Sequence, residues 1–325
     1  MRIHWATDYI DASGNAYGYS VHNNTLRKFV AAIAELSPEA KHSVTIVSPD
    51  FYTKRIPDKV NWLFTMFEGT TLPEMYQERI RMADYLLAPS QWVKGLFGQY
   101  VDLSKVYIVN HGVEKDFTYR QREFPKTKPF RFLWVGAPNP RKGWEEVIHT
   151  WTRAGFMRTK HLELYIKTTK VEGVQKKGNI ILDGRNLSRK DLVALYHSSH
   201  CFLFPTRGEG FGLTLAEAMR TGLPCISTYY SGVTDFFDNT VGYTIGHTMG
   251  PGRVSFVGAP KDEYETEIAF PDPVQMAEIM WQITLNYDSA LALGYRAAMR
   301  IKEKFTWEKS AQTLIDHIKS VGGGD

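Results

Sequence analysis

Apolar residues along the chain fall into short runs that alternate with stretches of helical spacing. Short apolar runs bounded by turn residues predict buried strands, and strands that alternate with helices are typical of parallel α/β layers. The predicted strands of the first part are 3–6, 43–47, 61–66, 85–88 and 106–109, and helices are predicted at 19–36 and 74–82. The second part has predicted strands at 130–135, 162–166, 179–182, 201–204 and 225–228.

A polar, proline-containing segment, 119–129, separates the two series and is the best candidate for a linker. Because the α/β pattern begins again after it, we predict two Rossmann-like domains that face each other across a cleft. We place the first domain at 1–122 and the second at 123–304. The segment 246–264 has glycines and prolines but no clear period, and we expect an irregular surface loop with a short hairpin.

The composition is that of an ordinary globular protein, with 43% hydrophobic and 23% charged residues. The net charge of +4 suits an anionic substrate, but the charges are scattered, so nucleic acid is a possible partner that we do not favour. Cys201 and Cys225 lie in apolar runs and are predicted to be core residues in a reducing compartment. No leader sequence is visible, and no apolar run approaches the roughly 18 residues that span a bilayer. We therefore expect a cytoplasmic protein, soluble or in peripheral contact with a membrane.

The most informative stretch is 206–219, in which a glycine-rich turn leads into a helix. Glu209 stands before the expected helix start and Glu217 stands after it. A helix start offers unpaired N–H groups and a positive dipole end to a phosphate, whereas carboxylates accept hydrogen bonds from hydroxyls. This combination predicts a pocket for a nucleotide sugar. The alternative is an exposed helix start with two solvated acids.

The Glu209-x7-Glu217 spacing resembles the E-x7-E signature of the glycosyl transferases group 1 family, retaining glycosyltransferases with the GT-B fold (glycosyltransferase family 4-like). The similarity continues through 222–227 and 231–236. It implies that Glu209 lies against the donor sugar and that Glu217 holds the ribose of the nucleotide. The remaining residues of the donor site would then include Gly210, Phe211, Gly212, Leu213 and Thr214.

A second resemblance lies at 136–143, which is similar to the G-R-x-x-x-x-K-G phosphate loop of the same family. Gly136 and Lys142 match this pattern, but Ala137 stands where the family has an arginine. Arg141 could supply the missing cation from a different point of the backbone, and both cations could instead be solvated residues before a helix. Such a clamp would neutralise a leaving diphosphate. The turn at Gly184 and Arg185 matches the region that cradles the base through its backbone.

The sequence motifs that indicate an acceptor site are weaker than those of the donor site. The glycine-containing loop with Gly14, Tyr17 and Gly18 resembles the first-domain loop that faces the donor phosphates and the acceptor. Glu68 follows a predicted strand, where doubly wound sheets bind ligands, and it either orients the acceptor hydroxyl or is a capping or solvated acid. His111 lies in a turn that borders the cleft in the family, and the alternative interpretation is a structural histidine.

The resemblance also implies that the last helix, in 305–325, crosses back to the first domain. No D-x-D pair or zinc-ligand spacing occurs, so we expect no cofactor and a metal-independent reaction. The predicted function is retaining transfer of a sugar from a nucleotide-diphosphate sugar to a hydroxyl acceptor, which is a glycan, a lipid-linked molecule or a small molecule. The alternatives are glycosylation of a modified base in DNA and non-catalytic binding of a nucleotide sugar.

Overall fold

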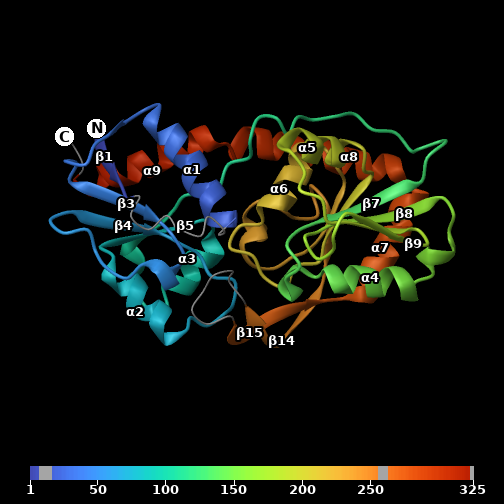
Figure 1. Cartoon of the computed structure of the whole chain (residues 1–325), viewed down its shortest axis with the longest axis horizontal. Coiled ribbons are helices and arrows are strands. Elements are labelled where there is room, and N and C mark those ends of the chain that lie inside the picture. The colour runs from blue at the N-terminus through green and yellow to red at the C-terminus, as the bar shows by residue number, and fades with distance from the viewer. Residues whose placement is uncertain (7–16, 255–262, 323–325) are drawn as a thin grey trace.

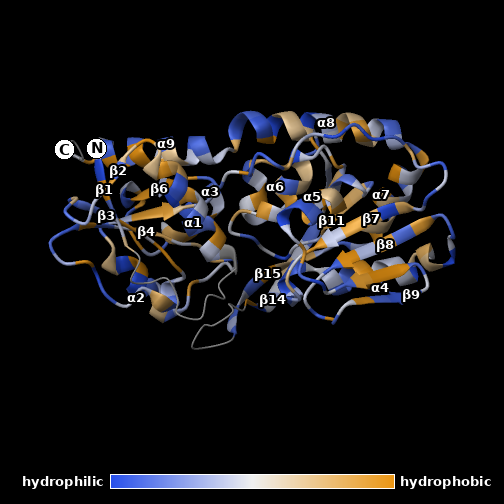
Figure 2. Cartoon of the chain, turned by 45° about the horizontal axis from the view of Figure 1, so that its top comes forward, coloured by the Kyte–Doolittle hydropathy of each residue, from blue (hydrophilic) through white to orange (hydrophobic). Residues whose placement is uncertain are grey.

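Two α/β units follow each other along the chain, and we call them domain one and domain two (Figure 1). The computed structural model describes residues 1–6, 17–254 and 263–322. The strands of both units contain many hydrophobic residues, which are orange in Figure 2. Examples are β4 (Val60–Phe64) and β7 (Phe130–Val135). The domain limits 1–122 and 123–304 stay a prediction.

Domain one is built on a parallel sheet whose strands are ordered β2-β1-β3-β4-β5-β6. Besides β4, these strands are β1 (Arg2–Trp5), β2 (Glu35–Leu36), β3 (His42–Ile46), β5 (Tyr85–Ala88) and β6 (Val106–Ile108). Its helices are α1 (Tyr17–Ala31), α2 (Glu74–Met82) and α3 (Gln91–Phe97), with 3₁₀ turns η1 (Pro49–Phe51) and η2 (Leu103–Lys105). All five residues of β3 are buried, as expected for a strand that is covered on both faces.

Domain two has the strand order β13-β12-β11-β7-β8-β10-β9, in which only the β9–β10 pair is antiparallel. Its further strands are β8 (Leu162–Lys167), β9 (Val174–Lys177), β10 (Ile180–Asp183), β11 (Cys201–Phe204), β12 (Cys225–Thr228) and β13 (Tyr243–Ile245). Its helices are α4 (Trp144–Arg153), α5 (Arg189–His197), α6 (Leu213–Arg220), α7 (Pro273–Leu285) and α8 (Tyr287–Lys304). The 3₁₀ turns are η3 (Pro140–Lys142), η4 (Phe156–Arg158) and η5 (Ser231–Asp235).

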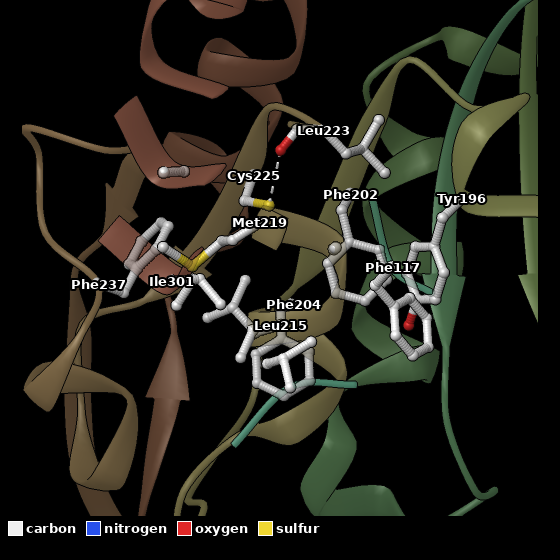
Figure 3. Packing of buried hydrophobic residues seen from close by; sticks show 14 of the residues in the cluster. Phe117, Tyr196, Phe202, Phe204, Leu215, Met219, Leu223, Cys225, Phe237 and Ile301 are labelled. Carbon is white, nitrogen blue, oxygen red and sulfur yellow. Dashed lines mark hydrogen bonds between the residues drawn. The ribbon is translucent and has the colours of Figure 1, made fainter. Parts of the chain in front are cut away.

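The core of domain two fixes helix α6 against the sheet (Figure 3). Leu215 and Met219 of α6 are fully buried in the same cluster as Phe204 of β11. Cys225 lies in this cluster, and its thiol donates to the carbonyl oxygen of Leu223 at 3.0 Å. Cys201 is also buried and free, so both cysteines are core residues, as predicted.

Two segments differ most from the predicted elements. The helix expected over 19–36 ends at Ala31, and residues 35–36 form the edge strand β2 because they pair with β1. The segment expected to be irregular contributes to a long antiparallel hairpin of β14 (His247–Val254) and β15 (Tyr264–Pro271). The glycines and proline of β14 hide its period, and contacts with domain one, described below, hold the hairpin.

The last helix, α9 (Trp307–Ser320), crosses back to domain one, as the resemblance implied. Trp307, Leu314 and Ile318 are buried in one cluster with Ile3 and Val44 of the first sheet. Thr306 caps the helix, because its hydroxyl accepts from the N–H of Lys309. Within the described residues, no helix combines the length and the apolar character that a membrane crossing needs.

Candidate active site

The glycine-rich turn predicted to bind a donor connects β11 to α6, so it lies at the carboxyl end of a central strand. Gly212 has a φ of 101°, a left-handed conformation that favours glycine. Leu213 and Thr214 open the helix behind it, with no capping side chain and no acid in the first turn. The N–H groups of this helix start are therefore not satisfied by a cap, which suits a phosphate.

Glu209 is 5% exposed and lies between two cations from the phosphate-like loop. The Lys142 ammonium donates to its Oε1 at 2.6 Å, and Arg141 Nη1 is 3.3 Å from the same oxygen. The hydroxyl of Thr206 adds a third donor at 3.2 Å. The structure therefore brings together the acid and both cations that were singled out as catalytic candidates.

Burial and the neighbouring charges shift the pKa values of Glu209 and Lys142. Burial would raise the pKa of the Glu209 carboxyl, but the charges of Lys142 and Arg141 outweigh it, so the pKa lies below its ordinary value. Burial lowers the pKa of the Lys142 ammonium, although Glu209 opposes this effect. The carboxylate is consequently held ionised and aimed at the lysine, an arrangement that can bind hydroxyls on one side and a phosphate on the other.

Local backbone geometry delivers the two cations. The side chain of Asn139 accepts from the N–H of Arg141 at 2.9 Å and so starts the 3₁₀ turn η3. Gly143 ends the turn with a φ of 71°, and any side chain there would overlap the carbonyl of Pro205. Gly136 leaves room for Trp134, since a Cβ would come within 2.8 Å of its ring, and Trp134 Nε1 donates to the Lys142 carbonyl at 3.1 Å.

Arg141 also joins the two domains. Its Nη2 is 3.3 Å from Oε1 of Glu68, an acid of domain one, and its Nη1 donates to the carbonyl of Gly208. Burial raises the pKa of Glu68, with Arg141 opposing the shift. The described contacts of Arg141 are thus with two carboxylates and a carbonyl. Its Nε and the Glu68 Oε2 are buried with no hydrogen-bond partner among the described residues.

Glu217, the second acid of the motif, lies on α6 and is buried. The hydroxyl of Tyr196 on α5 donates to its Oε2 at 3.3 Å. Burial raises the pKa of Glu217 to about 7, against the opposing charge of Arg189. A half-protonated carboxyl with free acceptor capacity can bind a pair of hydroxyls such as those of a ribose.

The predicted base-binding turn is rigid. A Cβ at Gly184 would overlap the carbonyl of Val171, so only glycine fits there. Arg185 donates from Nη2 and Nε to the buried Asp183 at 2.8 and 3.0 Å, and the Tyr165 hydroxyl donates to the same carboxyl at 2.5 Å. Hydrogen bonds from Arg185 hold the pKa of Asp183 well below its usual range. Asp183 was not predicted as a site residue. The sequence does show an acid directly after a predicted strand and directly before Gly184 and Arg185.

Among the acceptor-side candidates, Gly14 lies outside the described residues. Tyr17 and Gly18 open helix α1, of which only the backbone is described at these positions. His111 is buried with its ring centroid 5.1 Å from that of Phe211 in the donor loop. Burial lowers its pKa to about 3, so this imidazole is neutral near pH 7.

Domain one packs directly on the donor loop. The Ser90 hydroxyl donates to the carbonyl of Gly210 at 2.7 Å, and Ser90 also caps α3. Asp235 of domain two accepts from the Gln91 N–H at 3.0 Å and from the Asn110 side chain at 3.2 Å. No signal in one sequence pointed to these partners, because they join segments more than a hundred residues apart.

Over residues 1–6, 17–254 and 263–322, no group of three or more His, Cys, Asp or Glu residues is arranged to hold a metal ion.

Part of the chain is similar to a known protein family. The family described as Glycosyl transferases group 1 matches residues 113–250, which include the phosphate-like loop and both acids. The serotype-specific mannosyltransferase WbdA of Escherichia coli is 26% identical over 235 residues, a match that covers 59% of this chain and 29% of that protein. The chain thus spans less than a third of this curated relative.

Solved structures share the fold over nearly the whole chain. The sucrose-phosphate synthase of Thermosynechococcus elongatus has a TM-score of 0.66 at 14% identity, with 93% of this chain and 78% of that chain covered. Anabaena Alr3699/HepE in complex with UDP and glucose also has a TM-score of 0.66, at 12% identity, with 91% and 81% covered. These proteins have the GT-B fold predicted for this sequence. The chain therefore has the GT-B fold, and its residues 113–250 are similar to the glycosyl transferases group 1 family.

Proposed function

We propose that this protein is a retaining, metal-independent glycosyltransferase that moves a sugar from a nucleotide-diphosphate sugar to a hydroxyl acceptor. The observation that carries this proposal is the placement of Glu209 and Glu217 on either side of an uncapped helix start, with Lys142 bound to Glu209 at 2.6 Å. The group 1 family match over this segment supports it, as does the UDP named in the HepE structure.

In the proposed complex, the diphosphate lies against the first turn of α6 and takes a hydrogen bond from Lys142. The ammonium and the helix dipole stabilise the negative charge that builds on the leaving diphosphate, which is the largest catalytic contribution in many enzymes. Glu209 accepts hydrogen bonds from the sugar, and Glu217 accepts them from the ribose. The anomeric carbon then acquires oxocarbenium character.

The acceptor approaches from domain one and attacks the anomeric carbon on the face that the diphosphate leaves. Its oxygen forms the new glycosidic bond while the bond to the phosphate oxygen breaks, and its proton passes to that phosphate oxygen. Glu68 is the acceptor-side acid of this proposal, because its buried Oε2 has no described partner and can accept from an acceptor hydroxyl.

Glu209→Gln tests the proposal. UDP-glucose and GDP-mannose are first screened by thermal shift, since a bound donor raises the melting temperature. With the donor that binds, we expect the variant to lose about 100-fold or more in turnover, because an interaction with the reacting sugar is removed. Nucleotide affinity should change little.

The matched control is Glu145→Gln on the exposed side of α4, which should behave as wild type. A wild-type protein that binds no nucleotide, or a Glu209→Gln variant with unchanged turnover, would refute the proposed function.

A further inference from the structure

The β14–β15 hairpin is an arm of domain two that packs on domain one, at the lower edge between the domains in Figure 1. Tyr264 and Ile268 of β15 are buried in a cluster with Phe67 and Tyr76 of domain one. The Tyr264 hydroxyl also donates to Oδ1 of Asp50 at 2.7 Å. Side chains alternate along a strand, so Thr266, which lies between these two anchors, faces domain one as well.

Thr266 holds the loop that follows Glu68. Its Oγ1 accepts from the backbone N–H of Thr70 at 3.0 Å and from that of Thr71 at 3.3 Å. Gly69 makes this approach possible, since a Cβ there would overlap the Thr266 side chain. One hydroxyl oxygen thus pairs two consecutive N–H groups of a loop that begins one residue after the acceptor-side acid.

The same strand also contacts the donor loop. The N–H of Ala269 donates to the carbonyl of Arg207 at 3.0 Å, and the Arg207 guanidinium lies over the Phe270 ring, 4.7 Å from its centroid. Arg207 precedes Glu209 by two residues. Because Thr266 and Ala269 are three residues apart, about 10 Å of strand separates the two contacts. One short strand therefore touches both loops that carry the active-site acids.

We propose that Thr266 is a positioning residue of the acceptor side, which fixes the loop 69–71 and thereby holds Glu68 against Arg141. This inference rests on the proposed function, because it assigns Glu68 a task in transfer. Without the hydroxyl, the N–H groups of Thr70 and Thr71 lose their acceptor, and the loop no longer has a single position. Glu68 then samples positions away from Arg141 and from the reacting centre, and small misplacements of this kind are costly in catalysis.

Residue-resolved amide exchange tests the contact directly. Thr266→Val keeps the shape of the side chain but removes the acceptor oxygen, whereas Thr266→Ser keeps the oxygen. We expect the amides of Thr70 and Thr71 to exchange about tenfold faster in Thr266→Val, the effect of losing roughly one hydrogen bond's net stabilisation. Thr266→Ser should remain close to wild type. Thr248→Val, an exposed position on β14 of the same hairpin, is the matched control and should change nothing.

A second measurement separates positioning from a merely structural role. UDP-glucose hydrolysis, with water in place of the acceptor, should slow about tenfold in Thr266→Val while UDP affinity stays within about twofold. Thr266→Ser should restore the rate. Exchange at Thr70 and Thr71 that equals wild type in Thr266→Val would overturn the inference, and so would faster exchange with an unchanged hydrolysis rate. A wild-type protein that binds neither UDP nor GDP would instead refute the proposed function, while the exchange data would still judge the contact.

Discussion

Arg141 connects two carboxylates that belong to different domains, Glu68 and Glu209. With the partly exposed Lys142, they form a quartet of two acids and two bases whose formal charges cancel. A buried charge is costly unless it is paired, which explains why the ion pairs of the quartet are close. A diphosphate adds negative charge here, so its entry is expected to draw Lys142 away from Glu209. Under the proposed function, the alanine at position 137, where the family has an arginine, makes Lys142 the more important partner of the phosphates.

The carboxyl of Glu217 is expected to weaken the fold as the pH rises. Its pKa is about 7 in the folded protein, against an ordinary value of 4.5, so the folded state holds the proton more tightly than the unfolded chain. The free energy of unfolding therefore falls between these two values, by about 3 kcal/mol at most. Glu217→Gln cannot titrate, and its stability relative to wild type should increase over the same pH interval.

Urea denaturation from pH 4 to pH 8 measures this difference. Above about pH 7 the advantage of Glu217→Gln should level off, because both states of the wild-type protein are then ionised. Glu145→Gln on α4 should show no such dependence. A difference between Glu217→Gln and wild type that stays constant with pH would mean that Glu217 is not a proton-holding group.

At the scale of elements, the donor loop is shaped by its contact with domain one as much as by its own turns. A Cβ at Gly208 would overlap the backbone carbonyl of Glu68, which has no freedom to move aside. A Cβ at Gly210 would meet the Met66 side chain, whose sulfur would lie at 2.7 Å and whose Cβ at 2.9 Å. Both glycines are therefore required by the close approach of domain one, Gly208 by a backbone carbonyl and Gly210 by a side chain.

Gly208→Ala should consequently destabilise the protein by about 1–3 kcal/mol, the usual cost of overpacking a tight contact. Gly95→Ala is the matched control, because Gly95 lies in helix α3 with nothing within 4 Å of the added methyl. It should stabilise the protein by about 0.5–1 kcal/mol, since alanine is the better helix former. Urea denaturation compares the two. Equal stabilities of Gly208→Ala and wild type would show that the domains do not close on this loop.

The elements that were predicted exactly are those with strong local signals. The strands 85–88, 130–135, 201–204 and 225–228 and the helix 74–82 match their observed bounds, because buried parallel strands are continuous apolar runs and turn residues limit them. The hairpin β14–β15 was predicted only as a short hairpin in an irregular loop, because β14 has no buried face of its own apart from Val254. Its conformation comes from β15, which packs on a distant domain.

The residues of the candidate site also divide into those with a local sequence signal and those without one. Glu209, Glu217 and Lys142 were identified from residue type and spacing, and the structure brings Lys142 onto Glu209. The bond between Arg141 and Glu68 was not foreseen, because it joins positions 73 residues apart in two domains. Pair contacts across a domain interface depend on the docking of the two sheets, and no local pattern encodes that docking.

At the scale of the whole molecule, the chain passes between the domains at two adjacent points. The N–H of Val113 donates to the carbonyl of Phe305 at 3.0 Å, so the outgoing and returning segments are hydrogen-bonded. Gly112 is required here, since a Cβ would overlap the backbone of Trp307. Helix α9 then returns the end of the chain to the sheet where the chain began. The core of domain one is therefore incomplete without α9.

Leu314→Ala tests this dependence. Leu314 is 0% exposed and packs in the cluster that contains residues of β1, β3 and β4, from Ile3 to Phe64, which lie 250 or more positions earlier in the chain. Removing a buried leucine side chain costs about 2–5 kcal/mol through lost burial and the cavity left behind. We expect amide protection to fall in the strands of domain one, while β7, β11 and β12 of domain two keep theirs.

Leu285→Ala is the matched control, because Leu285 ends α7 with 85% of its surface exposed, and its effect should stay within about 0.5 kcal/mol. If Leu314→Ala loosens only α9 itself, the helix is an appendage that frays without consequence for the sheet. If the strands of domain one lose protection together with α9, the two form one cooperative unit, since local unfolding follows shared burial rather than chain order. The second outcome is expected, because the Trp307, Leu314 and Ile318 side chains are buried in the same cluster as those of Ile3 and Val44.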